Sequence, residues 1–222
     1  MLEKVKLFFH NQTFLRINFI KGDNMKELIN KIKKNKLLTI LLAVIIISCI
    51  LGVLFPVFLK ESNKDLIKTS IEEFFLAIDK NQLNYLNSFF QSLTNNTITT
   101  SMIWLLGISI IGIPIIIMSI FIKGFLVGFS FIGILITYGF KGLIIALIYT
   151  LPNIINLLSS FLLGYYAISF SGMIYRSVFK KETTNFSPIV KRYIKIGIFF
   201  LTFSVFISLI ESYLVPQILK FL

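Results

Sequence analysis

Side chains able to carry chemistry are scarce in this chain of 222 residues. It contains one cysteine, Cys49, and one histidine, His10, which excludes an internal disulfide, a histidine-based catalytic triad and a histidine metal cluster. From Trp104 to Tyr175 there is no Asp, Glu, His, Arg or Cys. We therefore predict that the protein is not an enzyme and that it uses no cofactor and no metal ion.

Three charged residues lie in or beside long apolar runs, namely Glu211, Lys123 and Lys141. A carboxylate within a membrane-spanning segment is a candidate functional group, because burying its charge in lipid is costly. Glu211 lies close to the end of its apolar run, which favours a structural ion pair with Lys141 at similar depth. Lys123 is expected at the inner membrane surface, where its aliphatic stem can extend toward water.

The composition predicts an all-α integral membrane protein. Hydrophobic residues make up 56% of the chain, more than a soluble domain can bury but well suited to a lipid bilayer. The formal net charge of +12 would suggest nucleic-acid binding in a soluble protein. Here the basic residues flank apolar runs, so membrane orientation and anionic headgroups explain them better. We expect membrane lipids as partners and no nucleic acid.

Hydropathy predicts five transmembrane helices, with a turn at Lys123-Gly124 between the second and the third. Their ranges are Leu37–Leu59, Met102–Ile122, Gly124–Phe140, Asn153–Tyr175 and Ile194–Val215.

The stretch 142–175 would measure roughly 51 Å as one helix, too long for a single span. Pro152 removes a backbone donor and clashes with the preceding turn, and Asn153 can cap a new helix. We predict a break at Pro152-Asn153, preceded by a short re-entrant or interfacial helix over residues 142–151 that is entered through Lys141 and Gly142. Irregular backbone at membrane depth needs protein or a watery cavity around it, so this break is a candidate functional region.

Basic residues set the predicted orientation. With the N-terminus inside, sixteen of the 22 Lys and Arg residues lie on the inner side, so we expect a cytoplasmic N-terminus and an external C-terminus. Residues 1–36 then form a basic cytoplasmic arm and residues 37–222 the five-span domain. Back-translated with AT-rich codons, the residues just before Met25 can read as a ribosome-binding site. Residues 1–24 are therefore either a mis-annotated extension or a natural arm that rests on the membrane.

The segment 60–100 is the one external stretch large enough to meet a partner. Its apolar residues recur at helical spacing, which predicts two short amphipathic helices on the outer leaflet or on neighbouring spans. The residues predicted to dock an external domain are Ile71, Phe74, Phe75, Ile78, Phe89 and Phe90. The alternative is that this apolar face simply rests on lipid.

Small residues recur along the predicted spans, and in lipid they let helix backbones approach closely. The predicted helix-packing positions are Gly107, Gly112, Pro114, Gly124, Gly128, Gly133, Gly164 and Gly172. The spacing of Gly124 and Gly128 favours packing within one subunit, and a homodimer seam is the alternative.

Glycines, prolines and aliphatic residues follow one another in a specific order over five stretches, Trp104–Pro114, Phe121–Phe129, Lys141–Leu143, Leu151–Asn153 and Ala167–Ser171. Together, from about Lys36 to the C-terminus, they resemble the stage II sporulation protein M family. The resemblance implies a bacterial cell-membrane protein, on the mother-cell side of the septum, that acts in engulfment of the forespore. It also implies partners: a membrane-anchored lytic transglycosylase and an amidase. The family has no established catalytic residues to carry over.

We therefore expect a non-enzymatic scaffold that anchors and localises peptidoglycan-remodelling enzymes during sporulation engulfment. The alternative is a permease subunit of a transporter driven by a separate ATPase. Short re-entrant helices also occur in such subunits, and this chain has no phosphate-binding loop of its own.

Overall fold

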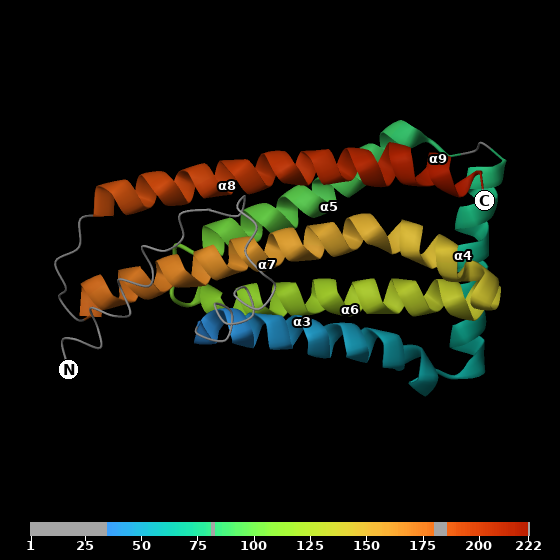
Figure 1. Cartoon of the computed structure of the whole chain (residues 1–222), viewed down its shortest axis with the longest axis horizontal. Coiled ribbons are helices and arrows are strands. Elements are labelled where there is room, and N and C mark those ends of the chain that lie inside the picture. Colours follow the sequence, from blue (N-terminus) through green and yellow to red (C-terminus); the bar gives the residue numbers. More distant parts are fainter. Residues whose placement is uncertain (1–34, 81–82, 180–185, 222) are drawn as a thin grey trace, which may run out of the picture. The chain divides into compact units, whose positions relative to one another are not determined.

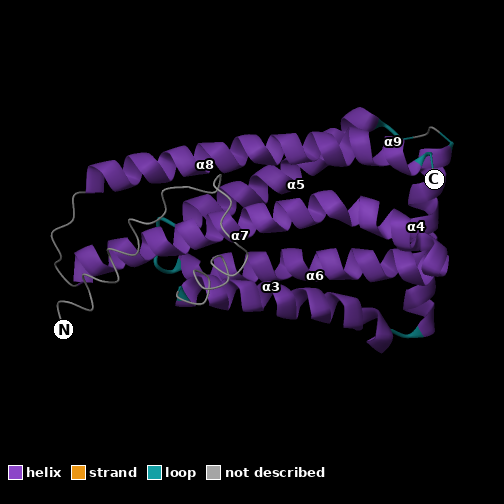
Figure 2. Ribbon diagram, viewed as in Figure 1, coloured by secondary structure: helices purple, strands orange, loops and turns teal. Residues whose placement is uncertain are grey.

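The computed structural model describes residues 35–80, 83–179 and 186–221, and all regular structure within these ranges is helical, as Figure 2 shows. The elements are α3 (Lys36–Leu54), η1 (Phe55–Phe58), α4 (Glu61–Asp79), α5 (Tyr85–Leu106), α6 (Gly112–Tyr138), η2 (Gly139–Gly142), α7 (Leu143–Phe179), α8 (Phe186–Leu209), η3 (Ile210–Leu214) and α9 (Val215–Leu219). The all-α prediction is confirmed. The predictions for residues 1–34, including a start at Met25, lie outside the described residues.

The chain divides into two compact units, residues 1–39 and residues 40–222. In the second unit α6 and α7 form an antiparallel hairpin joined by η2, and α5 packs against α8 (Figure 1). Helix α5 also contacts α6 and α7. Helix α7 contacts α5, α6 and α8 and contributes more buried residues than any other described helix, which places it at the centre of the bundle. Helix α4 runs across the end of the bundle at which η2 and α9 lie (Figure 1).

Three helical stretches among the described residues are long and apolar enough to cross a membrane, namely Lys36–Phe58, Gly112–Val178 and Ser187–Leu219. The second stretch contains both arms of the α6–α7 hairpin. Helix α5 is not among them, because asparagine, serine, threonine and glutamine are frequent along its length. The chain is therefore a multi-pass membrane protein, and the count of five spans remains a prediction.

The predicted turn at Lys123-Gly124 is wrong. Helix α6 passes through both residues, and the chain turns instead at residues 107–111, between α5 and α6. This turn is rich in isoleucine, so hydropathy could not separate it from the helices around it. Ser171 Oγ on α7 lies 2.6 Å from the carbonyl oxygen of Gly107 and 3.0 Å from that of Ser109, so its one hydroxyl hydrogen is shared between two carbonyl groups of this turn. The second and third predicted helices are therefore misplaced.

The predicted break at Pro152-Asn153 is also wrong, because α7 continues through both residues as one helix of 37 residues. Proline removes one backbone donor, and a membrane helix tolerates this where other groups re-satisfy the backbone. Pro152 leaves the carbonyl oxygen of Ile148, four residues earlier, without its helical donor. Asn153 Nδ2 donates to the next carbonyl oxygen along the helix, that of Tyr149, at 3.3 Å, so this side chain lies along the existing helix and does not cap a new one. Residues 142–151 form no separate re-entrant helix.

Candidate functional site: a polar network inside the bundle

A lysine lies in the middle of α6, far from either end of the helix. At 1.5 Å per residue, Lys123 is about 16 Å from the first residue of α6 and about 22 Å from the last. Its ammonium group donates to Asn156 Oδ1 at 3.0 Å and to Ser160 Oγ at 2.8 Å, both on α7. The prediction that Lys123 lies at the inner membrane surface is therefore wrong: its side chain ends among polar groups within the bundle.

The hydrogen bonds continue from α7 to α5 through two buried asparagines. Asn156 Nδ2 donates to Asn96 Oδ1 at 2.5 Å. Asn96 Nδ2 in turn donates to Glu211 Oε2 at 2.9 Å and to Ser208 Oγ at 3.0 Å. Ser92 Oγ, one turn before Asn96 on α5, donates to the same carboxylate oxygen of Glu211. One network thus joins α5, α6, α7, α8 and η3.

Along the path of hydrogen bonds that joins Lys123 to Glu211, every donor points the same way, from the lysine toward the glutamate. Lys123 donates to Asn156, Asn156 to Asn96, and Asn96 to Glu211. This order suits a cation at one end, Lys123, and an anion at the other, Glu211. The two asparagines therefore bridge a charge pair, which lowers the cost of placing either charge inside the bundle.

The backbone changes its winding where it carries Glu211. Residues 210–214 form a π-helical turn in which the Val215 amide donates to the carbonyl oxygen of Ile210. Pro216 follows directly and cannot donate a regular helical bond to the preceding turn. Such turns within α-helices occur frequently at functional sites. Among the described residues, Glu211 Oε1 is buried with no hydrogen-bond partner.

The predicted ion pair between Glu211 and Lys141 is not formed in the described part of the chain. Glu211 is bound by Ser92 and Asn96, while Lys141 lies exposed in η2. Sequence reasoning matched two charges by their predicted depth. It missed Asn96 and Asn156. What could have indicated them in the sequence is that each is an amide side chain within a predicted helix.

Two of the predicted packing glycines lie against α3. A Cβ atom at Gly124 would overlap the Ser48 hydroxyl, and one at Gly128 would overlap the carbonyl oxygen of Cys49. The approach is mutual, because a Cβ atom at Gly52 on α3 would overlap the carbonyl oxygen of Phe125 on α6. This face of α6 is therefore covered by the chain itself and is not free to form a homodimer seam.

The remaining predicted packing positions divide into two groups. A Cβ atom would overlap neighbouring atoms at Gly107, Gly112 and Gly164, and at Gly133 it would lie in tight contact, 3.1 Å from the end of the Ile71 side chain. A Cβ atom at Gly172 would have no neighbouring atom within 4 Å, and Pro114 is exposed, so these two residues do not make the predicted contacts. Pro114 instead occupies the first turn of α6, where its missing N–H leaves no bond unmade. Gly197, which sequence reasoning missed, lies against the Trp104 indole.

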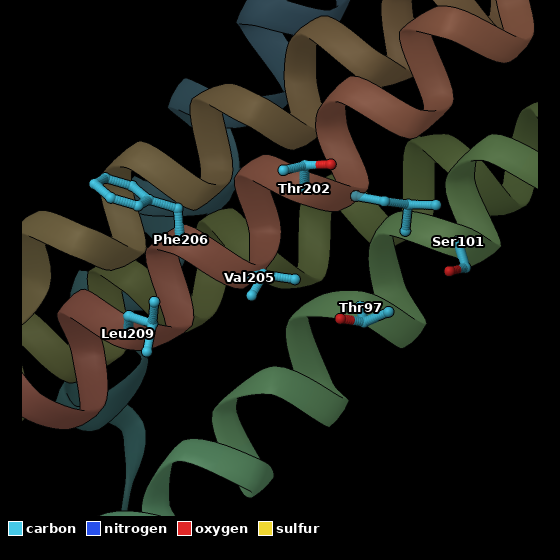
Figure 3. Close-up of a pocket in the computed structure, with 7 residues that line it drawn as sticks. Thr97, Ser101, Thr202, Val205, Phe206 and Leu209 are labelled. Atoms are coloured by element: carbon cyan, nitrogen blue, oxygen red, sulfur yellow. The ribbon is translucent and has the colours of Figure 1, made fainter.

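An open groove runs between α5 and α8, close to the network (Figure 3). Its volume is about 510 Å³, and it is lined by Thr97, Ser101, Leu201, Thr202, Val205, Phe206 and Leu209. Apolar side chains dominate this lining. The Thr97 hydroxyl, next in sequence to Asn96, is buried without a partner among the described residues.

Comparison with known proteins identifies the family. The profile of Stage II sporulation protein M matches residues 38–216, which is most of the chain. The chain belongs to the stage II sporulation protein M family. No curated protein and no solved structure gave a significant match. The family links this multi-pass membrane protein to sporulation, and the predicted resemblance is confirmed.

In this family member, the residues predicted to dock an external domain pack mainly on the chain itself. Ile78 is buried in a cluster with Val215 and Leu219 of α9. Phe75 stacks edge-on against Tyr138 at a centroid distance of 5.4 Å, and Ile71 lies beside Gly133.

Some aromatic residues of the segment 60–100 contact other helices, and others are exposed. Phe74 contacts Tyr149 yet is 37% exposed, and Phe90 is 60% exposed. Phe89 packs against Tyr213. The predicted second amphipathic helix is the first part of α5, continuous with the rest of that helix. The outward side of α4 is therefore formed by other residues, among them Leu66, Glu72, Glu73 and Leu76.

Proposed function

We propose that this protein is a non-enzymatic membrane scaffold that anchors and localises peptidoglycan-remodelling enzymes during sporulation engulfment. In this proposal the chain crosses the membrane five times, through α3, α5, α6, α7 and α8, with the N-terminus in the cytoplasm. The excess of basic residues around the predicted inner loops supports that orientation. Helix α4 then lies outside, and the membrane-anchored lytic transglycosylase and the amidase are the proposed partners.

The observation that carries the scaffold proposal is the packing of α4 across the end of the bundle. Its apolar face is held against α6, α7 and α9, through contacts such as Ile78 with Val215 and Phe75 with Tyr138. The opposite face carries Leu66, which is 66% exposed, and Leu76, which is 49% exposed, beside Glu72 and Glu73. A rigidly held helix with mixed apolar and acidic exposure is suited to binding another protein.

Site-specific photocrosslinking tests this proposal. A photoreactive residue at Leu66 or Leu76 in sporulating cells should capture a wall hydrolase, identified by mass spectrometry. The matched control is Ile111, which is 82% exposed but lies in the α5–α6 turn at the opposite end of the bundle. Capture of a hydrolase from Ile111 and not from α4 would contradict the proposed docking face. Capture from neither position would contradict the scaffold.

The network inside the bundle favours a second candidate, a permease subunit driven by a separate ATPase. Ionisable side chains within membrane helices often mark ion or substrate pathways. Glu211→Gln separates the two candidates, because it removes the charge but keeps the shape and one carbonyl acceptor. A transport role predicts a loss of function larger than the loss of folded protein, together with an ATPase that co-purifies with it. A scaffold role predicts that Glu211→Gln lowers the function of the protein only in proportion to the loss of folded protein.

A further inference from the structure

We propose that the start of α8 is a binding site for the phosphate-bearing headgroups of anionic phospholipids, formed by Lys191 and Lys195. The two lysines are exposed and four residues apart, so they project from the same face of the helix. Neither α7 nor α8 contains an acidic residue. The ion pairs formed in the described part of the chain lie in α4, so neither lysine is neutralised by one of them.

Tyr193 fixes the direction in which these lysines point. Its side chain is buried, its hydroxyl donates to the carbonyl oxygen of Trp104 at 2.5 Å, and its ring stacks on Phe170 at 4.1 Å. Successive residues on an α-helix are about 100° apart, so positions two before and two after Tyr193 lie on the far side of the helix. Lys191 and Lys195 therefore point away from the bundle.

The apolar surface beside the lysines indicates a lipid and not a soluble anion. Ile194, Ile198 and Phe199 are 44%, 56% and 63% exposed, respectively, on the adjoining turns. After Lys195, α8 carries no further charge, so Lys195 lies where the apolar run begins. Ammonium groups at that level meet phosphates while the side chains deeper in contact acyl chains. Trp104, packed beside Tyr193, is an aromatic residue of the kind common at this depth.

Lipid binding by the full-length protein tests this site. The protein is placed in nanodiscs of phosphatidylcholine containing increasing fractions of phosphatidylglycerol, and retained lipids are measured by native mass spectrometry. Each lysine removed should lower the relative association constant for phosphatidylglycerol roughly 5-fold, and Lys191→Gln with Lys195→Gln roughly 30-fold. The matched control is Lys64→Gln with Lys68→Gln on α4, two lysines that face carboxylates. The control should leave the preference unchanged.

Two results would overturn the proposal. One is an equal preference for phosphatidylglycerol in the α8 double variant and the unmodified protein. The other is displacement of the lipid by excess inorganic phosphate, which would make this a site for soluble anions. Because both side chains are exposed, the helix content measured by circular dichroism should not change, and the two single variants provide independent measurements. The result does not depend on whether the protein acts as a scaffold.

Discussion

The network predicts that Lys123 and Glu211 are energetically coupled although they do not touch. Breaking a buried charge pair by removing one partner typically costs about 3–5 kcal/mol, because the other charge is left uncompensated. Two asparagines separate this pair, so we expect Lys123→Met and Glu211→Gln each to cost about 3 kcal/mol, the lower end of that range. The double variant leaves no unpaired charge and should cost less than the sum of the two, by at least about 1 kcal/mol.

The assay is a double-mutant cycle on the free energy of unfolding, measured for the purified protein in detergent micelles. Lys141→Met is the matched control, because depth alone would pair Lys141 with Glu211 whereas the structure leaves Lys141 exposed in η2. Combined with Glu211→Gln it should be additive within about 0.5 kcal/mol. Additivity in the Lys123 cycle, or coupling in the Lys141 cycle, would refute the reasoning from the network.

Three further predictions concern helix packing, the bond between Tyr193 and the end of α5, and the ion pair at the start of α4. Gly128→Leu forces a side chain into a backbone carbonyl group of α3 and should destabilise the protein by about 3 kcal/mol or more. The control, Gly172→Ala, places its methyl group where no neighbouring atom lies within 4 Å, so it should be neutral or stabilise the protein by up to about 1 kcal/mol. Thermal unfolding measures both effects. Tyr193→Phe removes the bond to the end of α5 and should cost about 1 kcal/mol in the same assay; no change would count against that bond. The hydrogen bond and the charge of Lys64 hold the pKa of the Glu61 carboxyl below its ordinary value. This pair therefore stabilises the folded state slightly at a pH above the ordinary pKa of a glutamate. That stabilisation is lost as the pH falls through the lowered pKa. NMR titration should show the pKa of Glu61 rising in Lys64→Met, and an unchanged pKa would argue against the contact.

The sequence was sufficient to predict a helical membrane protein, but not where its second, third and fourth helices begin and end. Hydropathy measures how strongly a segment partitions into lipid, and it stays high through an isoleucine-rich turn. The turn at residues 107–111 was therefore predicted to be part of a helix. Lys123 was interpreted as the end of a membrane-spanning helix, because charged residues usually lie at the ends of such helices. Likewise, Pro152 was interpreted by the intrinsic tendency of proline to end a helix, whereas α7 continues through it as one helix.

The glycine pattern was informative about close approach but not about the partner. Gly124 and Gly128 could have met another copy of the chain as readily as another helix of the same chain. Only the folded bundle assigns them to Ser48, Cys49 and Gly52 of α3. The same limit applies to α4, whose apolar spacing predicted an amphipathic helix correctly but left open which surface it would cover.

By itself the sequence determined that the chain is helical, that it belongs in a membrane and to which family it is related, because composition, hydropathy and residue order are properties of local segments. The tertiary structure alone decided that a lysine in α6 and a glutamate in η3 are joined through asparagines on α7 and α5. Hydrogen bonds between helices depend on how each helix is rotated about its axis and on which neighbours it meets. Those two quantities arise only when the whole bundle packs.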